Sequence, residues 1–251
     1  MLYAVIGDVH GCSRELNELL DLIDKQFPEA CKIQVGDLVH KGPDSAGAVQ
    51  TSMDRIHVQL LGNHEEKHLR WLQYEKSGKP HKMRRVEDYP KVGLTDAQED
   101  YLINKSVLYF RDPEDALVVV HGGISQRAWL PTEPRWAALD KEARKHHKVL
   151  LYTRFQSPEG YSVMLGQETP EDVWWGDAYD GRFGTAVYGH QAYDTQEHPQ
   201  EHPHALGVDL GCVYGNKLCA AIFLDGVHVD TLTVQAKATY RSHGEDTYDA
   251  T

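Results

Sequence analysis

The chain has 251 residues, and its 26 Lys and Arg against 38 Asp and Glu give a formal net charge of −12. A hydrophobic content of 41% and a charged content of 25% are typical of a globular protein with a sizeable core. The acidic charge argues against a broad basic face that binds nucleic acid, and no apolar run approaches the roughly 18 residues of a membrane span.

The four cysteines, Cys12, Cys31, Cys212 and Cys219, form no CxxC pair and are too few for a disulfide scaffold in a chain of this length. The first residues show neither a basic segment nor a small-residue cleavage site, so we predict no signal peptide. We therefore expect a reduced, cytoplasmic protein that does not bind membranes.

Five short apolar runs each end in a polar turn that contains glycine. The runs are 2–6, 32–35, 56–61, 117–120 and 186–188, and the turns are Gly7-Asp8-Val9-His10-Gly11, Gly36-Asp37-Leu38-Val39-His40-Lys41-Gly42, Gly62-Asn63-His64-Glu65, His121-Gly122-Gly123 and Gly189-His190. Aliphatic and β-branched runs bounded by glycine are typical of buried strands.

Helical patterns lie between these strands. Leu16, Leu19, Leu20 and Ile23 recur at i, i+3, i+4 and i+7, which predicts an amphipathic helix with Ser13 as its N-cap. Residues 65–74 show a second helical pattern after the third strand. The alternation of strand and helix indicates an α/β fold, in which the polar turns lie at the carboxyl ends of strands, where such sheets bind ligands.

The C-terminal part predicts strands at 206–209, 218–224 and 227–234, with Asp225-Gly226 as a hairpin turn between the last two. We therefore expect a mixed sheet or two packed sheets. Residues 1–237 are predicted to form the catalytic domain. Residues 75–105 are expected to be an irregular insertion or cap, 194–204 a surface loop and 238–251 a disordered tail.

Carboxylate, imidazole and amide side chains gather in the glycine-containing turns: Asp8, His10, Asp37, Asn63, His64, His121 and His190. These groups suit divalent metals such as Mn, Fe and Zn. On adjacent strand ends they can converge on two ions, and the central Asp37 is the best candidate for a carboxylate that bridges both. The set contains no thiolate, which argues against a structural cysteine zinc site.

The same turns resemble the five signatures of the calcineurin-like metallophosphoesterases, over about residues 1–235. Within that superfamily the chain resembles the phosphoprotein-phosphatase branch. That branch includes protein Ser/Thr phosphatases, symmetrical diadenosine tetraphosphatases and the phosphatase domain of bacterial polynucleotide kinase-phosphatases. The stretches 179–190 and 208–215 look closest to the last two groups.

The resemblance implies a four-layer α/β/β/α sandwich with two mixed sheets flanked by helices, and two divalent ions. Mn is the expected metal, with Fe, Zn, Co and Ni as alternatives. The implied ligands are Asp8, His10 and Asp37 for one ion, and Asp37, Asn63, His121 and His190 for the other. A hydroxide that bridges the ions would attack phosphorus, and His64 would protonate the leaving oxygen.

The second motif departs from that of the protein phosphatases, which carry Gly-Asp-x-Val-Asp-Arg-Gly where this chain has His40 and Lys41. The missing aspartate normally orients the proton-donating histidine, so the role of His40 is open. Lys41 keeps a positive charge for phosphate without the bidentate guanidinium group. Arg154 resembles the family's second phosphate-binding arginine or is a surface residue, and Asp209 either orients a ligand histidine or caps its turn.

This motif instead resembles that of the diadenosine tetraphosphatase-like phosphatases. We therefore expect a metal-dependent hydrolase of phosphate esters and anhydrides, with a dinucleoside polyphosphate such as diadenosine tetraphosphate as the preferred substrate. Protein Ser/Thr phosphatase and polynucleotide 3′-phosphatase activities are alternatives, which would make a phosphoprotein or a nucleic-acid end the partner. A metal-binding module without activity is a more remote alternative.

Three further features are interpreted as structural. The basic residues Lys76, Lys79, Lys82, Arg84 and Arg85 are taken as a solvated surface rather than a patch that attracts polyphosphate. His198, His202 and His204 are expected to belong to a loop, and Trp174 and Trp175 to pack in the interior.

Overall fold

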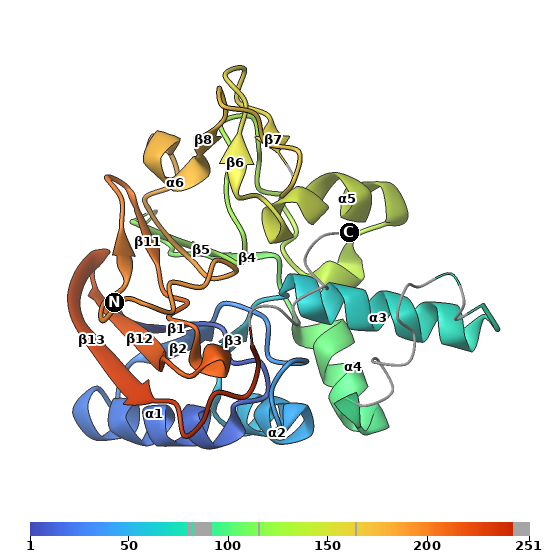
Figure 1. Cartoon of the computed structure of the whole chain (residues 1–251), viewed down its shortest axis with the longest axis vertical. Helices are drawn as coiled ribbons and strands as arrows, with labels where there is room; N and C mark the ends of the chain where they lie inside the picture. The colour runs from blue at the N-terminus through green and yellow to red at the C-terminus, as the bar shows by residue number, and fades with distance from the viewer. Residues whose placement is uncertain (80–81, 83–91, 115, 164, 243–251) are drawn as a thin grey trace.

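The computed structural model describes residues 1–79, 82, 92–114, 116–163 and 165–242, and its strands build two five-stranded sheets that pack face to face (Figure 1). The first sheet has the order β13-β12-β1-β2-β3. Its strands are β1 (Leu2–Ile6), β2 (Cys31–Gln34), β3 (Val58–Gln59), β12 (Lys217–Leu224) and β13 (Val227–Gln235). The first three run parallel, and β12 pairs antiparallel with β1 and β13.

The second sheet has the order β10-β11-β9-β5-β4. Its strands are β4 (Tyr109–Arg111), β5 (Leu117–Val120), β9 (Thr185–Tyr188), β10 (Gln200–Glu201) and β11 (Ala205–Gly207). β9 runs parallel to β5 and β11, while β4 and β10 are antiparallel edge strands. Both sheets are therefore mixed, which confirms the second of the two arrangements expected from the sequence.

Alternation along β1 divides the core into layers, because successive strand side chains point to opposite faces. Tyr3 and Val5 enter the core between the two sheets, together with Ile33, Val119 and Val187. Ala4 and Ile6 point the other way, into a core that helices cover. These helices are α1 (Ser13–Gln26), α2 (Ser45–Arg55) and α4 (Asp96–Lys105).

The outer face of the second sheet is covered by the segment between β5 and β9 (Figure 1). This segment contains η4 (Trp136–Ala138), α5 (Lys141–His147), η5 (Lys148–Leu151), α6 (Trp175–Ala178) and a small sheet of β6 (Phe155–Gln156), β7 (Ser162–Val163) and β8 (Val173–Trp174). Trp175 is fully buried against Tyr188 of β9. The layers run helix, sheet, sheet, helix, so the predicted four-layer architecture is confirmed.

Several local predictions are confirmed and several are wrong. The five apolar runs form β1, β2, β3, β5 and β9, and Asp225 and Gly226 connect β12 to β13 with positive φ angles of 50° and 78°. Ser13 does not cap α1, because Cys12 is the N-cap and the Ser13 hydroxyl donates to Asp44 Oδ2 at 2.6 Å. The loop expected at 194–204 contains β10.

The segment 75–105 is more regular than expected. Helix α3 (Asn63–Lys76) runs into it, and α4 occupies its last ten residues. Thr95 and Gln98 form a capping box at the start of α4, and Leu102 is fully buried. Residues 80–81 and 83–91 lie outside the described residues, and the assignment of 1–237 to one catalytic domain remains a prediction.

The expected disordered tail is ordered over its first residues. The backbone N–H of Tyr240 donates to the Val213 carbonyl at 3.0 Å, and its hydroxyl donates to Glu15 Oε1 at 2.8 Å. Residues 243–251 lie outside the described residues. Of the helices in the described part of the chain, none has the length and apolar content to span a membrane.

Candidate metal centre

The polar turns after five strands meet in one place. Asp8 and His10 follow β1, Asp37 follows β2, Asn63 opens α3 after β3, His121 follows β5 and His190 follows β9. All are buried except His190, which is half-buried. Candidate ligand atoms form two groups, and within each group all atoms lie within 4.8 Å of one another. The first group is His10, Asp37 and His64, and the second is Asp37, His121 and His190.

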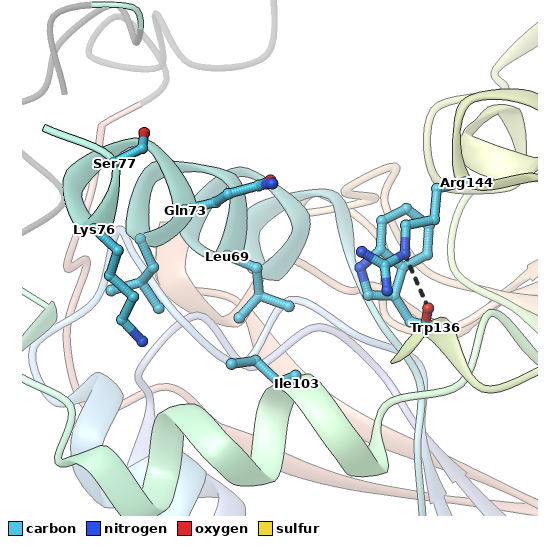
Figure 2. Close-up of a pocket in the computed structure, with 8 residues that line it drawn as sticks. Leu69, Gln73, Lys76, Ser77, Ile103, Trp136 and Arg144 are labelled. Atoms are coloured by element: carbon cyan, nitrogen blue, oxygen red, sulfur yellow. Dashed lines mark hydrogen bonds between the residues drawn. The ribbon is translucent and has the colours of Figure 1, made fainter. Parts of the chain in front are cut away.

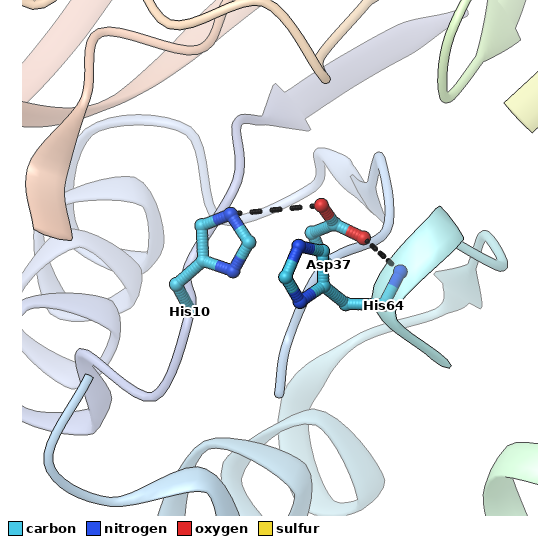
Figure 3. Close-up of side chains that lie close together, drawn as sticks. All are labelled: His10, Asp37 and His64. Carbon is cyan, nitrogen blue, oxygen red and sulfur yellow. Dashed lines mark hydrogen bonds and ion pairs between the residues drawn. The ribbon is translucent and has the colours of Figure 1, made fainter. Parts of the chain in front are cut away.

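Asp37 lies at the centre because it belongs to both groups. Its Oδ2 atom is 3.5 Å from His10 Nε2 and its Oδ1 atom is 3.4 Å from His121 Nε2. Figure 3 shows Asp37 between His10 and His64, with the backbone N–H of His64 donating to Asp37 Oδ1 at 2.9 Å. The Asp37 carboxylate thus lies beside both groups of candidate ligands, as a carboxylate that bridges two ions requires.

Backbone carbonyls orient the histidine rings. The Nδ1 atom of His10 is 3.2 Å from the Val39 carbonyl, and the Nδ1 atom of His121 is 3.0 Å from the Val35 carbonyl. Their Nε2 atoms therefore point toward Asp37. A ring nitrogen held in this way is typical of a metal-binding histidine, whose other nitrogen is then available to the ion.

Asn63 adjoins the second group. Its Oδ1 atom is 2.9 Å from His121 Nε2 and 3.1 Å from His190 Nδ1. The backbone N–H of His190 donates to Asp8 Oδ2 at 3.0 Å, which joins the turn after β9 to the turn after β1. The candidate ligands therefore come from turns of both sheets.

Buried negative charge makes this cluster suited to cations. Burial raises the pKa of Asp8 well above its usual value, and the charges of Asp209 and Asp37 raise it further. Within the described part of the chain, Asp8 Oδ1 is buried without a hydrogen-bond partner. Carboxylate, imidazole and amide donors around such an atom fit divalent metal ions, which would offset the cost of burying these charges.

The backbone of these turns is strained. Six non-glycine residues among those described have positive φ angles, and five of them lie in the turns of the centre: His10 (46°), Asp37 (58°), His40 (69°), Lys41 (65°) and His190 (68°). Each such conformation costs about 1–3 kcal/mol and persists only where the surroundings enforce it. Such strain is concentrated at functional sites in proteins.

Glu65 supports the strained turns, and the sequence analysis gave it no role. Its fully buried carboxylate accepts hydrogen bonds from the backbone N–H groups of Asp37 at 2.7 Å, Val39 at 3.0 Å and Gly62 at 2.9 Å. Burial, followed by the charge of Asp37, raises its pKa to about 7. Its position three residues after Gly62, at the start of a predicted helix, is the signal that could have identified it.

A cavity of about 220 Å³ adjoins the cluster, and its lining includes His10, Asp37, Lys41, Arg154, His190, Asp209 and Tyr214. Lys41 Nζ donates to the Tyr214 hydroxyl at 2.9 Å and lies 5.3 Å from the centre of its ring. Arg154 donates to the His190 carbonyl at 3.2 Å. The structure thus brings both cationic candidates to the centre, and it adds Tyr214, which the sequence analysis did not single out.

Asp209 forms a turn cap. Its Oδ1 atom accepts a hydrogen bond from the backbone N–H of Gly211 at 2.9 Å. Burial raises the pKa of Asp209 to about 6. Of the two roles considered for this residue, the turn cap is the one for which the structure shows a hydrogen bond.

Candidates away from the cluster contact other parts of the fold. His202 lies 2.7 Å from Asp177 and 2.8 Å from the Tyr188 hydroxyl, and Trp175 is buried as predicted. Lys76 is largely exposed and lies 3.9 Å from Glu99, while Arg84 and Arg85 fall outside the described residues. A larger cavity of about 410 Å³ lies between α3, α4, η4 and α5, and Figure 2 shows that apolar and polar side chains line it.

The architecture and the convergent donors define a candidate divalent-metal centre at the carboxyl ends of the strands. A model of the calcineurin-like phosphoesterases matches residues 1–230. The chain belongs to this family and is a metal-dependent phosphoester hydrolase.

Relatives of similar length share about a quarter of the sequence. The asymmetrical bis(5′-nucleosyl)-tetraphosphatase PrpE of Oceanobacillus iheyensis is 26% identical, with 87% of each chain covered. The symmetrical bis(5′-nucleosyl)-tetraphosphatase of a Janthinobacterium species is 28% identical, with 92% of this chain and 94% of the relative covered. A crystal structure provisionally named as a diadenosine tetraphosphatase superposes with a TM-score of 0.68 at 26% identity, and covers 94% of this chain and 93% of that one.

Proposed function

We propose that the enzyme hydrolyses a phosphoanhydride bond of dinucleoside polyphosphates such as diadenosine tetraphosphate. The observation that carries the chemistry is the position of Asp37, with one carboxylate oxygen 3.5 Å from His10 and the other 3.4 Å from His121. The names of the relatives support the substrate class, and they include both asymmetrical and symmetrical tetraphosphatases.

We assign the ligand sets that the family resemblance implies, and the proximity of His10 and His121 to Asp37 supports them. Asp8, His10 and Asp37 would hold one divalent ion, and Asp37, Asn63, His121 and His190 the other. Bound ions would supply a water of lowered pKa and neutralise charge on the phosphate. We propose Mn²⁺ as the native ion, and the low cysteine content supports a cytoplasmic location.

Lys41 and Arg154 would bind phosphate, and His64 would donate a proton. Lys41 and Arg154 line the cavity beside the ligands and would contact non-bridging phosphate oxygens. His64, held by its backbone N–H on Asp37, would protonate the leaving oxygen. A volume of about 220 Å³ is below that of pockets for whole drug-sized ligands, so the cavity suits phosphate groups, with the nucleosides outside it.

A substrate panel tests the proposal. Metal-free protein is restored with Mn²⁺ and assayed with diadenosine tetraphosphate, p-nitrophenyl phosphate, a phosphoserine peptide and a 3′-phosphorylated oligonucleotide. The fastest metal-dependent turnover is expected on diadenosine tetraphosphate. Two ADP molecules per substrate would indicate central cleavage, whereas ATP and AMP would indicate asymmetrical cleavage.

Other outcomes would overturn the substrate assignment. A preference for the peptide would make the chain a protein phosphatase, and a preference for the oligonucleotide would make it a polynucleotide 3′-phosphatase. Two bound ions without turnover of any substrate would support the inactive metal-binding module.

A further inference from the structure

His40 lies against His64 where related protein phosphatases carry an aspartate. The two Nδ1 atoms are 3.0 Å apart, which is a hydrogen-bond distance. The backbone N–H of His40 donates to Ser45 Oγ at 3.0 Å, which fixes the strained turn from which the ring projects. The contact joins the turn after β2 to the first turn of α3.

The contact between His40 and His64 lies within a column of neighbouring aromatic rings. The ring centres of His10 and His64 are 4.8 Å apart, those of His64 and His40 are 5.1 Å apart, and those of His40 and His68 are 5.8 Å apart. Trp71 continues the column at 5.6 Å from His68. His40 is therefore held between neighbours on both sides, and its Nδ1 atom has a defined direction.

We propose that His40 is a positioning residue that fixes the orientation and tautomer of His64 through the bond between their Nδ1 atoms. This inference rests on the proposed function, in which the Nε2 atom of His64, on the opposite side of its ring, serves the leaving oxygen. The Nδ1 atom of His40 performs the task that the aspartate performs in the protein phosphatases.

A neutral imidazole is suited to this task. Only one hydrogen can lie between the two Nδ1 atoms, so two protonated rings would oppose each other. Burial holds the pKa of His40 well below its usual value, and repulsion from His68 in its protonated form, from Lys67 and from Lys41 lowers it further. With its Nδ1 atom unprotonated, His40 accepts from His64 Nδ1–H, as a carboxylate oxygen would.

Three variants separate positioning from packing. His40→Phe keeps a ring in the column and removes the nitrogen. His40→Asn provides a polar group and tolerates the left-handed backbone, which Asn adopts more readily than most residues. His68→Phe is the matched control, because it alters the next ring of the column without touching His64. Melting temperature and bound metal are measured for each variant.

Phenyl phosphate and p-nitrophenyl phosphate report on proton donation, since phenolate is the poorer leaving group. His40→Phe is expected to lower kcat on phenyl phosphate about 100-fold, with little change on p-nitrophenyl phosphate or in either KM. His40→Asn is expected to restore at least a tenth of the lost rate, and His68→Phe to leave the ratio of the two rates unchanged. Equal losses on both substrates, or no gain from Asn over Phe, would overturn the proposal.

A nuclear magnetic resonance measurement tests the same contact without turnover. In ¹⁵N-labelled, metal-free protein, the His64 ring is expected to show one fixed tautomer and a scalar coupling across the bond between the two Nδ1 atoms. In His40→Phe these signals should change to those of mixed tautomers. A fixed tautomer in His40→Phe would refute the role of His40 even if the enzyme hydrolyses diadenosine tetraphosphate, and the expected change would support it even if another substrate is preferred.

Discussion

The carboxylate of Glu65 accepts a hydrogen bond from the backbone N–H of Asp37 at 2.7 Å, and the Asp37 carboxylate in turn accepts one from His64, the residue before Glu65, at 2.9 Å. The turn after β2 and the start of α3 are thus joined in both directions. This reciprocal pair keeps Asp37 in its left-handed conformation, with φ of 58°, and directs its carboxylate between the histidines.

Glu65→Gln should weaken this connection. An amide NH₂ group would face backbone donors in place of a carboxylate oxygen, and we expect a loss of about 2–3 kcal/mol in the free energy of unfolding. Urea denaturation of metal-free protein checks this value, and calorimetry should show weaker metal binding. The exposed Glu142→Gln is the control; equal stability of both variants would contradict the role of Glu65.

Asp37→Asn should remove binding of both ions, because one carboxylate serves both ligand groups. We expect metal content to fall from two ions to fewer than one and kcat to fall by more than about 100-fold, which exceeds typical losses from outer ligand partners. Inductively coupled plasma mass spectrometry measures the metal content. Asp225→Asn is a matched control, since Asp225 also has a positive φ but lies in the exposed hairpin; two ions in Asp37→Asn would refute the bridging assignment.

Tyr214→Phe should release Lys41 from its hydroxyl partner while keeping the ring beneath the ammonium group. Loss of one such hydrogen bond corresponds to a rise in KM of about two- to tenfold with kcat little changed. Steady-state kinetics with diadenosine tetraphosphate provide the measurement. Tyr240→Phe, which loses a hydroxyl bond to Glu15 instead, should leave KM unchanged.

His68 should make the protein sensitive to acid. Burial lowers its pKa to about 4, while the imidazole in the unfolded chain titrates near its usual value of about 6.5. Between these values the unfolded state binds more protons, so the free energy of unfolding falls as the pH decreases, by about 2 kcal/mol at pH 5.

His68→Phe removes this titration. It also replaces a ring whose two nitrogens have no hydrogen-bond partner within the described residues. Denaturation at pH 7 and pH 5 should show a smaller loss of stability in the variant than in the parent protein. The same loss in both would assign the acid sensitivity to other groups.

The convergence of the candidate ligands was predictable from sequence because each lies in a turn that follows a short apolar run. Val35 and Val120 end such runs, and the glycine-containing turns after them bring Asp37 and His121 together once the strands align. Gly36 shows why glycine is required there: a Cβ atom on it would lie 2.6 Å from the Gly62 backbone nitrogen. The close approach of two turns is thus encoded locally.

Other features depend on contacts distant in sequence. Tyr214 meets Lys41 across 173 residues, and no spacing rule predicts that pair. Helix α4 has few buried residues, so its apolar periodicity is weak, although the Thr95 and Gln98 capping box was readable. The contact of His40 with His64 also needed coordinates, because it depends on the strained turn that carries His40.

The candidate ligands come from both sheets, and the bond between Asp8 and His190 spans 182 residues. An ion held by Asn63 and His190 would therefore act as a reversible cross-link between the two halves of the sandwich. Asn63 and His190 are 127 residues apart, and closing a loop of that length restricts the unfolded chain, as a long-range disulfide does. Metal binding would thus stabilise the folded state as well as support catalysis, so a chelator would lower the free energy of unfolding of the whole molecule.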